Sequence, residues 1–207
     1  MQSKAHWENV YTTKAIKEVS WFQEHAALSQ QFIQRAESRK ESKIIDVGGG
    51  ASILVDELLS VGYKNITVLD ISEKALESAR QRLGTRSQYV TWLASDITTA
   101  ELSHHYFDVW HDRAVFHFLT EPKDRELYIE NVQHSVKSGG HVIVATFSLN
   151  GPTQCSGLDV VRYNPETLHG EFGDNFYLID HIEETHQTPF GTEQQFIYCF
   201  CKKGQDA

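Results

Sequence analysis

The chain has 207 residues, which is long enough for one well-buried α/β domain and short for two. Its composition, with 40% hydrophobic and 23% charged residues and only 4 prolines, is that of a globular protein and excludes a disordered or repetitive chain. The formal net charge of −9 comes without any cluster of lysines and arginines. This argues against nucleic acid as a partner, because binding it requires a concentrated basic face.

The sequence also carries signals about compartment. The N-terminus lacks the apolar core of a secretory signal, and no apolar stretch approaches the roughly 20 residues that span a bilayer. The 3 cysteines are too few for a disulfide framework, so we expect a cytoplasmic protein without membrane contact. Cys199 and Cys201 would share one face of a strand. A metal or redox pair is one interpretation; two buried thiols, with no metal, are the prediction.

Taken in chain order, short apolar runs alternate with segments of helical periodicity. Strands are predicted at residues 44–47, 66–69, 89–93, 107–110 and 141–146. Apolar residues recur with helical spacing in 54–59, 72–83 and 129–136. Ser72 is expected to cap the second of these helices and Gly84 to end it, whereas Gly139-Gly140 should end the third.

After the fifth strand the pattern changes. A loop rich in glycine, proline and serine covers 148–158, and a loop of that length without structure of its own is typical of a lid over a binding site. A short helix is expected to begin near Pro165. Two longer runs, 176–184 and 195–202, flank the turn-forming residues 188–191 and predict an antiparallel strand pair.

Repeated strand–helix–strand units predict an α/β fold of the Rossmann-like type. We expect a three-layer sandwich around a mostly parallel seven-stranded sheet with a C-terminal antiparallel strand pair. In such sheets ligands bind beyond the carboxyl ends of the strands, where the strand order reverses. Asp46, Asp70, Asp96 and His111-Asp112 follow four successive strands, so we expect them at one rim of the sheet.

The turn from Asp46 to Ser52 is rich in glycine. Glycines after a first strand let the backbone turn sharply and approach a ligand, while the next helix presents free N–H groups. A plain strand-to-helix turn and a dinucleotide site are the alternatives. The dinucleotide fingerprint requires a small residue at Ile53 and has no place for Asp46. Both features favour a ligand with an amino-acid moiety over one with a pyrophosphate.

Two later strand ends add partners for a nucleoside. A carboxylate at Asp70 can accept hydrogen bonds from both hydroxyls of a ribose, and Ile71 offers an apolar surface to an adenine. Asp96 can accept from the exocyclic amine of adenine, with Ile97 beside it. The alternatives are a capping turn with Ser72 for Asp70 and a solvated loop for Asp96.

These residues resemble the class I S-adenosylmethionine (SAM)-dependent methyltransferase superfamily over nearly the whole chain. The matching motifs are Asp46-x-Gly48-x-Gly50, Asp70, Ser95-Asp96-Ile97 and Trp110-His-Asp-Arg-Ala114. Ser52 replaces a third glycine that is usual in the family's loop. Residues 110–119, Asp124-Arg125 and Tyr128 are similar to the thiopurine and thiol methyltransferases and to the type 11/12 branch. Similar segments occur in small protein-lysine methyltransferases.

The resemblance implies SAM as the cofactor and S-adenosylhomocysteine (SAH) as its product. Residues implied to contact it are Trp7, Tyr11, Trp21, Asp46, Gly48, Gly49, Gly50, Asp70, Ile71, Asp96, Ile97 and His111. Asp46 and Gly48 would take the methionine part, with backbone carbonyls near His111. The aromatic residues, with Phe22, would form a lid on the sulfonium side. A helix simply packed on the core is the alternative for them.

The domain organisation follows from this assignment. We expect a single methyltransferase domain over 1–207, with an N-terminal helical lid at 1–40 and a cofactor-binding core at 41–147. Residues 148–207 would form a substrate-side loop and a C-terminal hairpin. Within the last part, Cys155 and residues 161–163 are substrate-side candidates, and 186–191 would overhang the same pocket.

Methyl transfer from SAM is an in-line displacement, so most of the rate comes from alignment and exclusion of water. A thiolate acceptor needs little more, whereas an amine or oxygen acceptor needs a base. Candidate catalytic residues are His111, Asp112, Arg113 and His117. Arg113 is expected to pair with Asp112 or with an anionic substrate. For His117 a packed position on a helix face is the alternative, and His104-His105 is expected in a solvated loop.

The sequence therefore predicts a methyltransferase that acts on a small-molecule acceptor, with a thiol or other soft nucleophile preferred. The closest alternative is a protein-lysine methyltransferase. An NAD-dependent oxidoreductase and a non-catalytic SAM-binding protein are further alternatives. No nucleic acid or membrane partner is expected, and the oligomeric state stays open.

Overall fold

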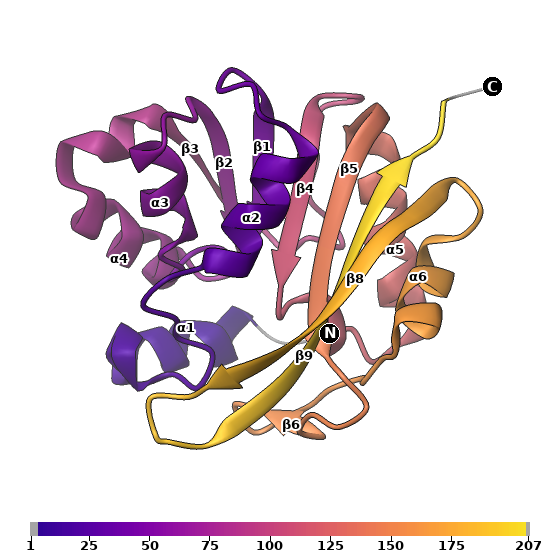
Figure 1. Ribbon diagram of the computed structural model, residues 1–207. Coiled ribbons are helices and arrows are strands. Elements are labelled where there is room, and N and C mark those ends of the chain that lie inside the picture. The colour runs from indigo at the N-terminus through magenta and orange to yellow at the C-terminus, as the bar shows by residue number, and fades with distance from the viewer. Residues whose placement is uncertain (1–3, 206–207) are drawn as a thin grey trace.

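A computed structural model describes residues 4–205 of the chain, so the first residues of the expected 1–40 lid and the last of 148–207 lie outside the described part. Its main sheet has seven strands in the order β3-β2-β1-β4-β5-β9-β8 (Figure 1). The strands are β1 (Lys43–Val47), β2 (Asn65–Asp70), β3 (Val90–Ala94), β4 (Phe107–Arg113), β5 (Val136–Phe147), β8 (Phe176–Gln187) and β9 (Glu193–Lys203). A separate pair is formed by β6 (Gln154–Cys155) and β7 (Leu158–Asp159).

Helices connect and cover the strands. The α-helices are α1 (Lys4–Thr13), α2 (Ala27–Ala36), α3 (Leu54–Ser60), α4 (Glu73–Leu83), α5 (Pro122–Ser135) and α6 (Pro165–Phe172). Short 3₁₀ turns are η1 (Ile16–Glu18), η2 (Gly84–Tyr89) and η3 (Phe116–Phe118). Within residues 4–205, none of these helices combines the length and apolar character needed to cross a membrane.

The sheet is parallel where the sequence alternates strand and helix. β1 lies between β2 and β4, and the pairs β1–β2, β1–β4, β2–β3 and β4–β5 are all parallel. β9 pairs antiparallel with both β5 and β8, which places β8 at the sheet edge. The strand order reverses between β1 and β4, which is where ligands bind in sheets of this kind. The predicted fold class is confirmed.

Two apolar cores, one on each face of the sheet, make the three layers. Neighbouring strand residues alternate between them: Ile44 belongs to the core with residues of α2, α3 and α4, and Ile45 to the core with residues of α5 and α6. Figure 1 shows α2 and α3 in front of the sheet and α5 and α6 behind it. Because both faces are covered, the parallel strands are almost continuously apolar.

Several predicted boundaries are confirmed. Ser72 caps α4, its side chain accepting from the backbone N–H of Ala75 at 3.2 Å, and Gly84 follows the helix with φ +58°. Helix α6 begins at Pro165, and the two C-terminal strands pair as expected around the turn at 188–191.

Three predicted boundaries were wrong. Helix α5 ends at Ser135, not at Gly139-Gly140, because Val136 pairs with Phe107 as the first residue of β5. Strand β4 continues through Arg113, so the polar residues expected after the strand belong to it. The loop at 148–158 contains the β6–β7 pair and therefore has structure of its own. In the first two cases a long-range backbone pairing overrides the local pattern, whereas the third is a short local hairpin.

A buried polar group ties β4 to α5. The phenol of Tyr128 accepts from Nε1 of Trp110 at 2.8 Å and donates to Oδ2 of Asp112 at 2.7 Å. Asp112 also accepts the backbone N–H groups of Val115 and Phe116. Burial raises the pKa of Asp112 to about 6, against these hydrogen bonds, which lower it. Asp112 is thus a structural anchor for the turn after β4.

We expect Tyr128→Phe to lower the free energy of unfolding by about 1–3 kcal/mol, because it leaves two fully buried polar groups without their shared partner. Urea denaturation followed by circular dichroism measures the change. Tyr177→Phe, at a side chain that is 64% exposed on β8, is the matched control and should unfold like the unaltered protein. Equal stability of the two variants would contradict the anchoring role.

Candidate functional site

Two adjoining cavities lie at the carboxyl ends of the parallel strands. The first is lined by Trp7, Tyr11, Trp21, Val47, Gly48, Leu69, Asp70, Ile71, Ser95, Asp96, Ile97, Thr98, Arg113, Ala114, Val115, Phe118, Leu119, Asp124 and Cys155. The second is lined by Tyr11, Ile16, Val19, Trp21, Phe22, Gln23, Ala26, Ser29, Asp46, Val47, Gly48, Gly49, Ala51, Ser52, Ile53, Leu54, His111 and Arg113. The two linings share Tyr11, Trp21, Val47, Gly48 and Arg113, so one elongated ligand can occupy both.

The turn after β1 leaves no room for side chains. Gly48 has φ +72°, and a Cβ there would lie 2.1 Å from Cγ2 of Val115. A Cβ on Gly49 would lie 2.2 Å from Oδ2 of Asp46. Glycine is therefore required for the backbone to pass this close to its neighbours while it turns.

Asp46 is almost fully buried beneath this turn and keeps one oxygen free. Its Oδ1 is 2.7 Å from Nδ1 of His111, and Oδ2 has no hydrogen-bond partner. The two residues are register partners on β1 and β4, which places their side chains on the same face of the sheet. A buried carboxylate oxygen without a partner is costly, and Asp46 lines the second cavity, so Oδ2 is available there as an acceptor.

A chain of hydrogen bonds continues from His111 across the molecule. Nε2 of His111 is 2.9 Å from Oγ of Ser29 on α2, and that oxygen is 3.3 Å from the phenol of Tyr198 on β9. Tyr198 accepts from Nε of Arg113 at 3.0 Å. Burial raises the pKa of Tyr198, so the phenol keeps its proton and donates along the chain. Four separate elements thus fix the geometry between Asp46 and Arg113.

Asp70 closes β2 on the wall of the first cavity. Its oxygens accept the backbone N–H groups of Gly50 at 3.0 Å and Ser72 at 2.8 Å. Burial raises the pKa of Asp70 to about 6, although both hydrogen bonds lower it. Each oxygen retains a second lone pair for a donor in the cavity. Gly50 lines neither cavity, and it serves the site through Asp70.

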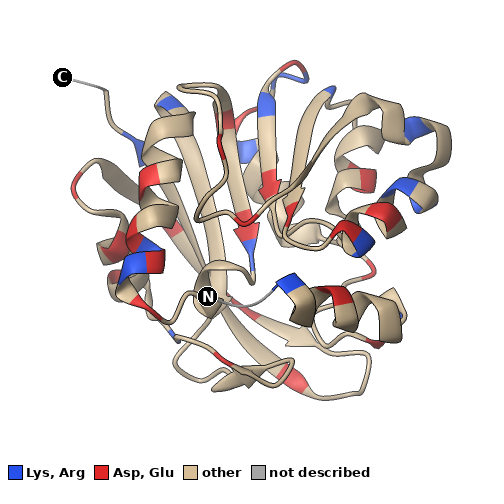
Figure 2. Ribbon diagram, turned by 180° about the vertical axis from the view of Figure 1, so that it is seen from behind, with Lys and Arg blue, Asp and Glu red and all other residues tan. Residues whose placement is uncertain are grey.

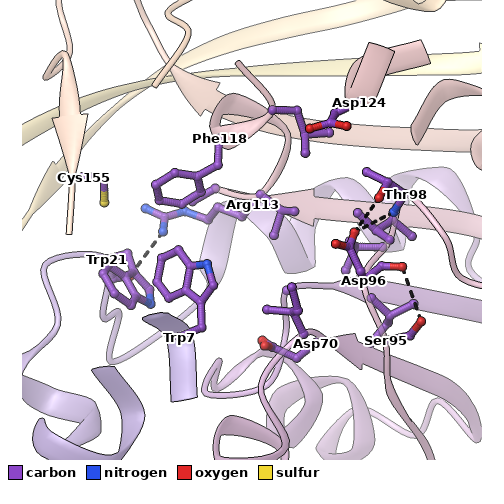
Figure 3. Close-up of a pocket in the computed structure, with 18 of the residues that line it drawn as sticks. Trp7, Trp21, Asp70, Ser95, Asp96, Thr98, Arg113, Phe118, Asp124 and Cys155 are labelled. Carbon is purple, nitrogen blue, oxygen red and sulfur yellow. Dashed lines mark hydrogen bonds between the residues drawn. The ribbon is translucent and has the colours of Figure 1, made fainter. Parts of the chain in front are cut away.

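Asp96 and Ile97 occupy the neighbouring wall. Oδ1 of Asp96 accepts from both the backbone N–H and the hydroxyl of Thr98, at 2.9 and 2.8 Å, which fixes the carboxylate in place. Ile97 is buried, and its carbonyl accepts from Nδ2 of Asn131 at 2.6 Å. Ser95 and Thr98 also line this wall. In Figure 3 Ser95, Asp96 and Thr98 lie opposite the aromatic side chains of Trp7 and Trp21, with Asp70 between.

Aromatic rings cover the other end of the first cavity. Trp7 makes edge-to-face contacts with Phe118 and Trp21, with ring centroids 5.1 and 5.7 Å apart (Figure 3). Tyr11 packs on Trp21 at 6.3 Å. Trp7 is packed on the core, as one alternative foresaw, and it also lines the cavity, so its place over a cofactor stays a prediction. Phe118 was not among the predicted residues.

Helix α1 is attached to the rim by its own carboxylate. Glu8 accepts the backbone N–H groups of Glu73 and Lys74 at 2.8 and 3.3 Å, at the N-terminus of α4. A negative side chain is favoured there by the unpaired N–H groups and the helix dipole. Of the expected 1–40 lid, α1 and the segment up to Ala26 line the cavities, and α2, which belongs to the helical layer over the sheet, adds Ser29 to the second cavity.

Arg113 lines both cavities and is held by residues far away in sequence. Nη2 is 3.2 Å from Oε2 of Glu184 on β8, and Nη1 donates to the carbonyl of Trp21 at 3.3 Å. The expected pairing with Asp112 was wrong, because Asp112 points into the core on the other face of the sheet. Glu184 also accepts from Nε2 of Gln23 at 3.2 Å.

The other catalytic candidates are not brought together. His111 lines the second cavity, but both ring nitrogens have partners. His117 is buried beside Phe147 and lines neither cavity; its Nδ1 accepts the backbone N–H of Phe147 at 3.2 Å. Burial lowers the pKa of His117 to about 3, so the ring is neutral. The packed alternative for His117 is the one that the geometry favours.

Only one of the substrate-side candidates reaches the first cavity. Cys155 on β6 lines it, and burial raises the pKa of its thiol to about 11, so the sulfur is protonated. Residues 161–163 lie behind this wall, with Arg162 bonded to the carbonyls of Leu149 and Gly151. The turn at 188–191 lines neither cavity, and His186 instead contacts the carbonyl of Ser20 at 2.8 Å.

The remaining cysteines lie in the sheet, where the sequence predicted buried thiols. Cys199 and Cys201 are buried free thiols on β9, and burial raises the pKa of each to about 12. Within residues 4–205 no group of three potential ligands is arranged to hold a metal ion. In Figure 2 lysines and arginines are interspersed with acidic residues along the helices.

Known proteins share this arrangement. A methyltransferase-domain family model matches residues 45–144, a range that runs from β1 through the glycine turn into β5. Over this part, just under half of its length, the chain is similar to methyltransferase domains. The resemblance of its strand-end motifs to SAM-dependent methyltransferases is confirmed.

Individual relatives are distant. The eEF1A lysine and N-terminal methyltransferase of Mus musculus is 23% identical over 141 residues, which cover 68% of this chain and 20% of the mouse protein. The chain thus spans about a fifth of the length of that relative. N-methyltransferase NodS from Bradyrhizobium japonicum WM9, solved with SAH, has a TM-score of 0.71 at 15% identity and covers 98% of this chain and 99% of its own.

A third relative has the same fold over almost the whole chain. It is a structure described by the conversion of a disulfide bond into a thioacetal group during echinomycin biosynthesis. The TM-score is 0.77 at 13% identity, and the match covers 99% of this chain and 93% of the other. At this identity the likeness establishes the fold of the complete chain, including the C-terminal β8–β9 pair.

We expect Gly49→Ala to weaken SAH binding by roughly tenfold or more, because the new Cβ displaces Asp46, whose Oδ2 would lie 2.2 Å away. Isothermal titration calorimetry measures the affinity. Gly170→Ala on α6 is the matched control, since nothing lies within 4 Å of a Cβ there. Unchanged SAH affinity in the Gly49 variant would show that the turn can move without consequence for the site.

Proposed function

We propose that this methyltransferase acts on a small-molecule acceptor with a soft nucleophile, a thiol in the first instance. The observation that carries the proposal is the composition of the acceptor end of the first cavity. Aromatic rings, Arg113 and the protonated thiol of Cys155 surround it, and histidine is absent from the described residues of its lining. An acceptor that needs no proton acceptor from the protein fits this environment best.

The proposed cofactor assignment divides SAM between the two cavities. Asp70 with Ile71 would hold the ribose and one adenine face, and Asp96 with Ile97 the rest of the adenine. The methionine part would occupy the second cavity under the glycine turn. Two observations support this fit: the unpartnered Oδ2 of Asp46 suits an ammonium group, and the turn has no space for a Cβ.

When bound, SAM supplies a methyl group on a positively charged sulfur, which is already activated for displacement. The contribution of the chain is alignment and exclusion of water. Trp7 and Trp21 are proposed to close the cavity over the reacting atoms, and their electron-rich faces favour a cation beneath them. Glu8 maintains that closure by holding α1 on α4.

Proton transfer by the chain has no support at the acceptor end. Asp124, the remaining carboxylate of the first cavity beside Asp70 and Asp96, lies on the side of Asp96 in Figure 3, away from Trp21 and Cys155. We therefore assign no general base. The described chemistry of the echinomycin-pathway relative, which converts a disulfide into a thioacetal, is in keeping with a sulfur acceptor.

A protein-lysine acceptor is the second candidate, and the likeness to eEF1A lysine and N-terminal methyltransferases favours it. Against it stands the cover of the first cavity, which α1 and the β6–β7 pair surround. A lysine side chain on a folded protein would have to enter past this cover, whereas a small molecule enters when the cover opens.

A panel of acceptors separates these candidates. The purified chain is incubated with SAM and with matched thiols, amines, phenols or lysine-containing peptides, and SAH formation is measured. We expect turnover with aromatic or aliphatic thiols at least tenfold above the matched amines and phenols. Faster methylation of a lysine peptide than of every small molecule would replace the proposal by the protein-directed alternative.

Cofactor affinity should depend on pH through Asp70. Since burial raises the pKa of Asp70 to about 6, the free carboxyl is protonated below that pH and accepts ribose hydroxyls less well. SAH affinity should therefore rise as pH increases from about 5 to 7 and then level off. Asp70→Asn should bind more weakly with a flat profile.

The measurement is calorimetry across that pH range, with circular dichroism as a check on folding. The stability of the fold should change in the opposite direction to the affinity. Because the pKa values of Asp70 and Asp112 are raised to about 6 in the folded state, the free energy of unfolding falls as pH rises through about 6. A gain in affinity over this range is therefore not a gain in folding. The same pH profile in both proteins would remove Asp70 from the ribose site.

A further inference from the structure

The two cavities meet at a tyrosine. Tyr11 on α1 belongs to the lining of both, together with Trp21, Val47, Gly48 and Arg113. On the proposed division of SAM, the nucleoside lies in the first cavity and the methionine part in the second, so the cofactor's sulfur lies at this junction. Of the five shared residues, Tyr11 is the one that carries a hydroxyl, a group that can both donate and accept a hydrogen bond.

The groups around the phenol of Tyr11 determine its protonation and what it can still bind. Burial raises the pKa of Tyr11 well above its ordinary value, and the charge of Asp70 and the thiol of Cys155 raise it further. A hydrogen bond with the side chain of Trp21 lowers it. Because an indole N–H can only donate, the phenol oxygen accepts from Trp21, and the O–H group is left to donate to a ligand.

The position of Tyr11 is set from two directions. Its ring centroid lies 6.3 Å from the rings of both Trp7 and Trp21. On the same helix, Glu8 accepts the first backbone N–H groups of α4 and so attaches α1 to the rim of the sheet. The phenol is therefore held at the junction of the cavities by ring packing and by a polar contact of its own helix.

Cys155 shows what this environment does to a thiol. Burial raises the pKa of Cys155 to about 11, although the positive charge of Arg113 lowers it. An acceptor thiol at this end of the first cavity loses water in the same way, and burial therefore favours its protonated form. Since the thiolate is the nucleophile, the acceptor requires groups that stabilise its negative charge. The sulfonium of SAM supplies part of that stabilisation, and a hydrogen-bond donor on the sulfur supplies the rest.

We propose that the hydroxyl of Tyr11 donates a hydrogen bond to the sulfur of the acceptor thiolate and is a catalytic residue of the methyl transfer. This inference rests on the proposed thiol acceptor. The thiol proton passes to water before the cover closes. A lone pair of the thiolate sulfur then forms the new S–C bond, while the C–S bond of the cofactor breaks and its electron pair stays on the cofactor's sulfur. Tyr11 keeps its own proton throughout, so no general base is required.

The experiment compares two aromatic thiols of similar size in Tyr11→Phe, a variant that keeps the ring and removes the hydroxyl. Phenylmethanethiol is mostly protonated in water at neutral pH, whereas 4-nitrothiophenol is ionised. At saturating phenylmethanethiol, kcat should rise with pH through an apparent pKa that belongs to the bound acceptor. In Tyr11→Phe we expect this apparent pKa to be higher by about one pH unit, which corresponds to roughly tenfold weaker stabilisation of the thiolate. For 4-nitrothiophenol kcat should stay independent of pH in both proteins.

A direct measurement accompanies the kinetics. With SAH in place of SAM no methyl transfer occurs, and the thiolate absorbance of bound phenylmethanethiol gives its pKa in the complex. This pKa should also be higher in Tyr11→Phe, while SAH affinity by calorimetry stays within about threefold of the unaltered protein. Tyr89→Phe is the matched control, because its phenol is 61% exposed and lines neither cavity. That variant should behave like the unaltered protein in every measurement.

Each contrary outcome has a distinct meaning. If Tyr11→Phe slows both thiols equally and leaves the apparent pKa unchanged, the phenol is a packing group and the proposal fails. If SAH affinity falls as much as turnover, Tyr11 contacts the cofactor and not the acceptor, which also overturns the proposal. If the unaltered protein binds SAH but methylates no thiol, the proposed acceptor class itself is wrong, and the role of Tyr11 is rejected with it.

Discussion

The hydrogen bond between Asp46 and His111 is the contact on which the site is built. It exists because β1 and β4 pair in parallel with these two residues opposite each other, at the point where the strand order reverses. A shift of one residue in that register would turn one side chain to the other face of the sheet. The second partner of His111 is Ser29 on α2, and Ser29 in turn contacts Tyr198 on β9, so this hydrogen-bonded chain extends to the antiparallel edge of the sheet.

The same edge strands determine where the cover lies. Side chains of β8 contact the segment before α2 at two points, Gln23 through Glu184 and the carbonyl of Ser20 through His186. Arg113 adds a third contact at Trp21. Glu8 of α1 adds a further contact, to the N-terminus of α4. Together these contacts attach the N-terminal aromatics to the rim from both sides. The cover is thus fixed by polar contacts at its margins and by ring packing at its centre.

Local patterns in the sequence were sufficient for the fold and for one half of the site. Alternation of strand and helix predicted the parallel sheet, and acidic residues at strand ends predicted three of its walls, at Asp46, Asp70 and Asp96. Such positions are readable because the carboxyl ends of parallel strands share one rim. The aromatic residues near the N-terminus were also found, since their chemistry suits a sulfonium.

The other half depends on contacts that local patterns do not contain. Ser29, Tyr198 and Glu184 have ordinary neighbours in sequence and become functional only through pairing across 71 to 169 positions. The predicted roles of Asp112 and His117 came from their place after a strand, whereas β4 continues and alternation turns Asp112 to the opposite core. A side-chain direction that reverses at every residue cannot be assigned until the strand's length is known.

The ionic composition of the two cavities bears on turnover. Their lining contains the carboxylates of Asp46, Asp70, Asp96 and Asp124 against the single cation of Arg113, so the described walls of the site carry an excess of negative charge. On the proposed assignment, SAM arrives with a net positive charge and SAH leaves without it, because methyl transfer removes the charge from sulfur. Electrostatic attraction to the site therefore weakens when SAM becomes SAH. The charges that favour binding of SAM thus also limit inhibition by the product SAH.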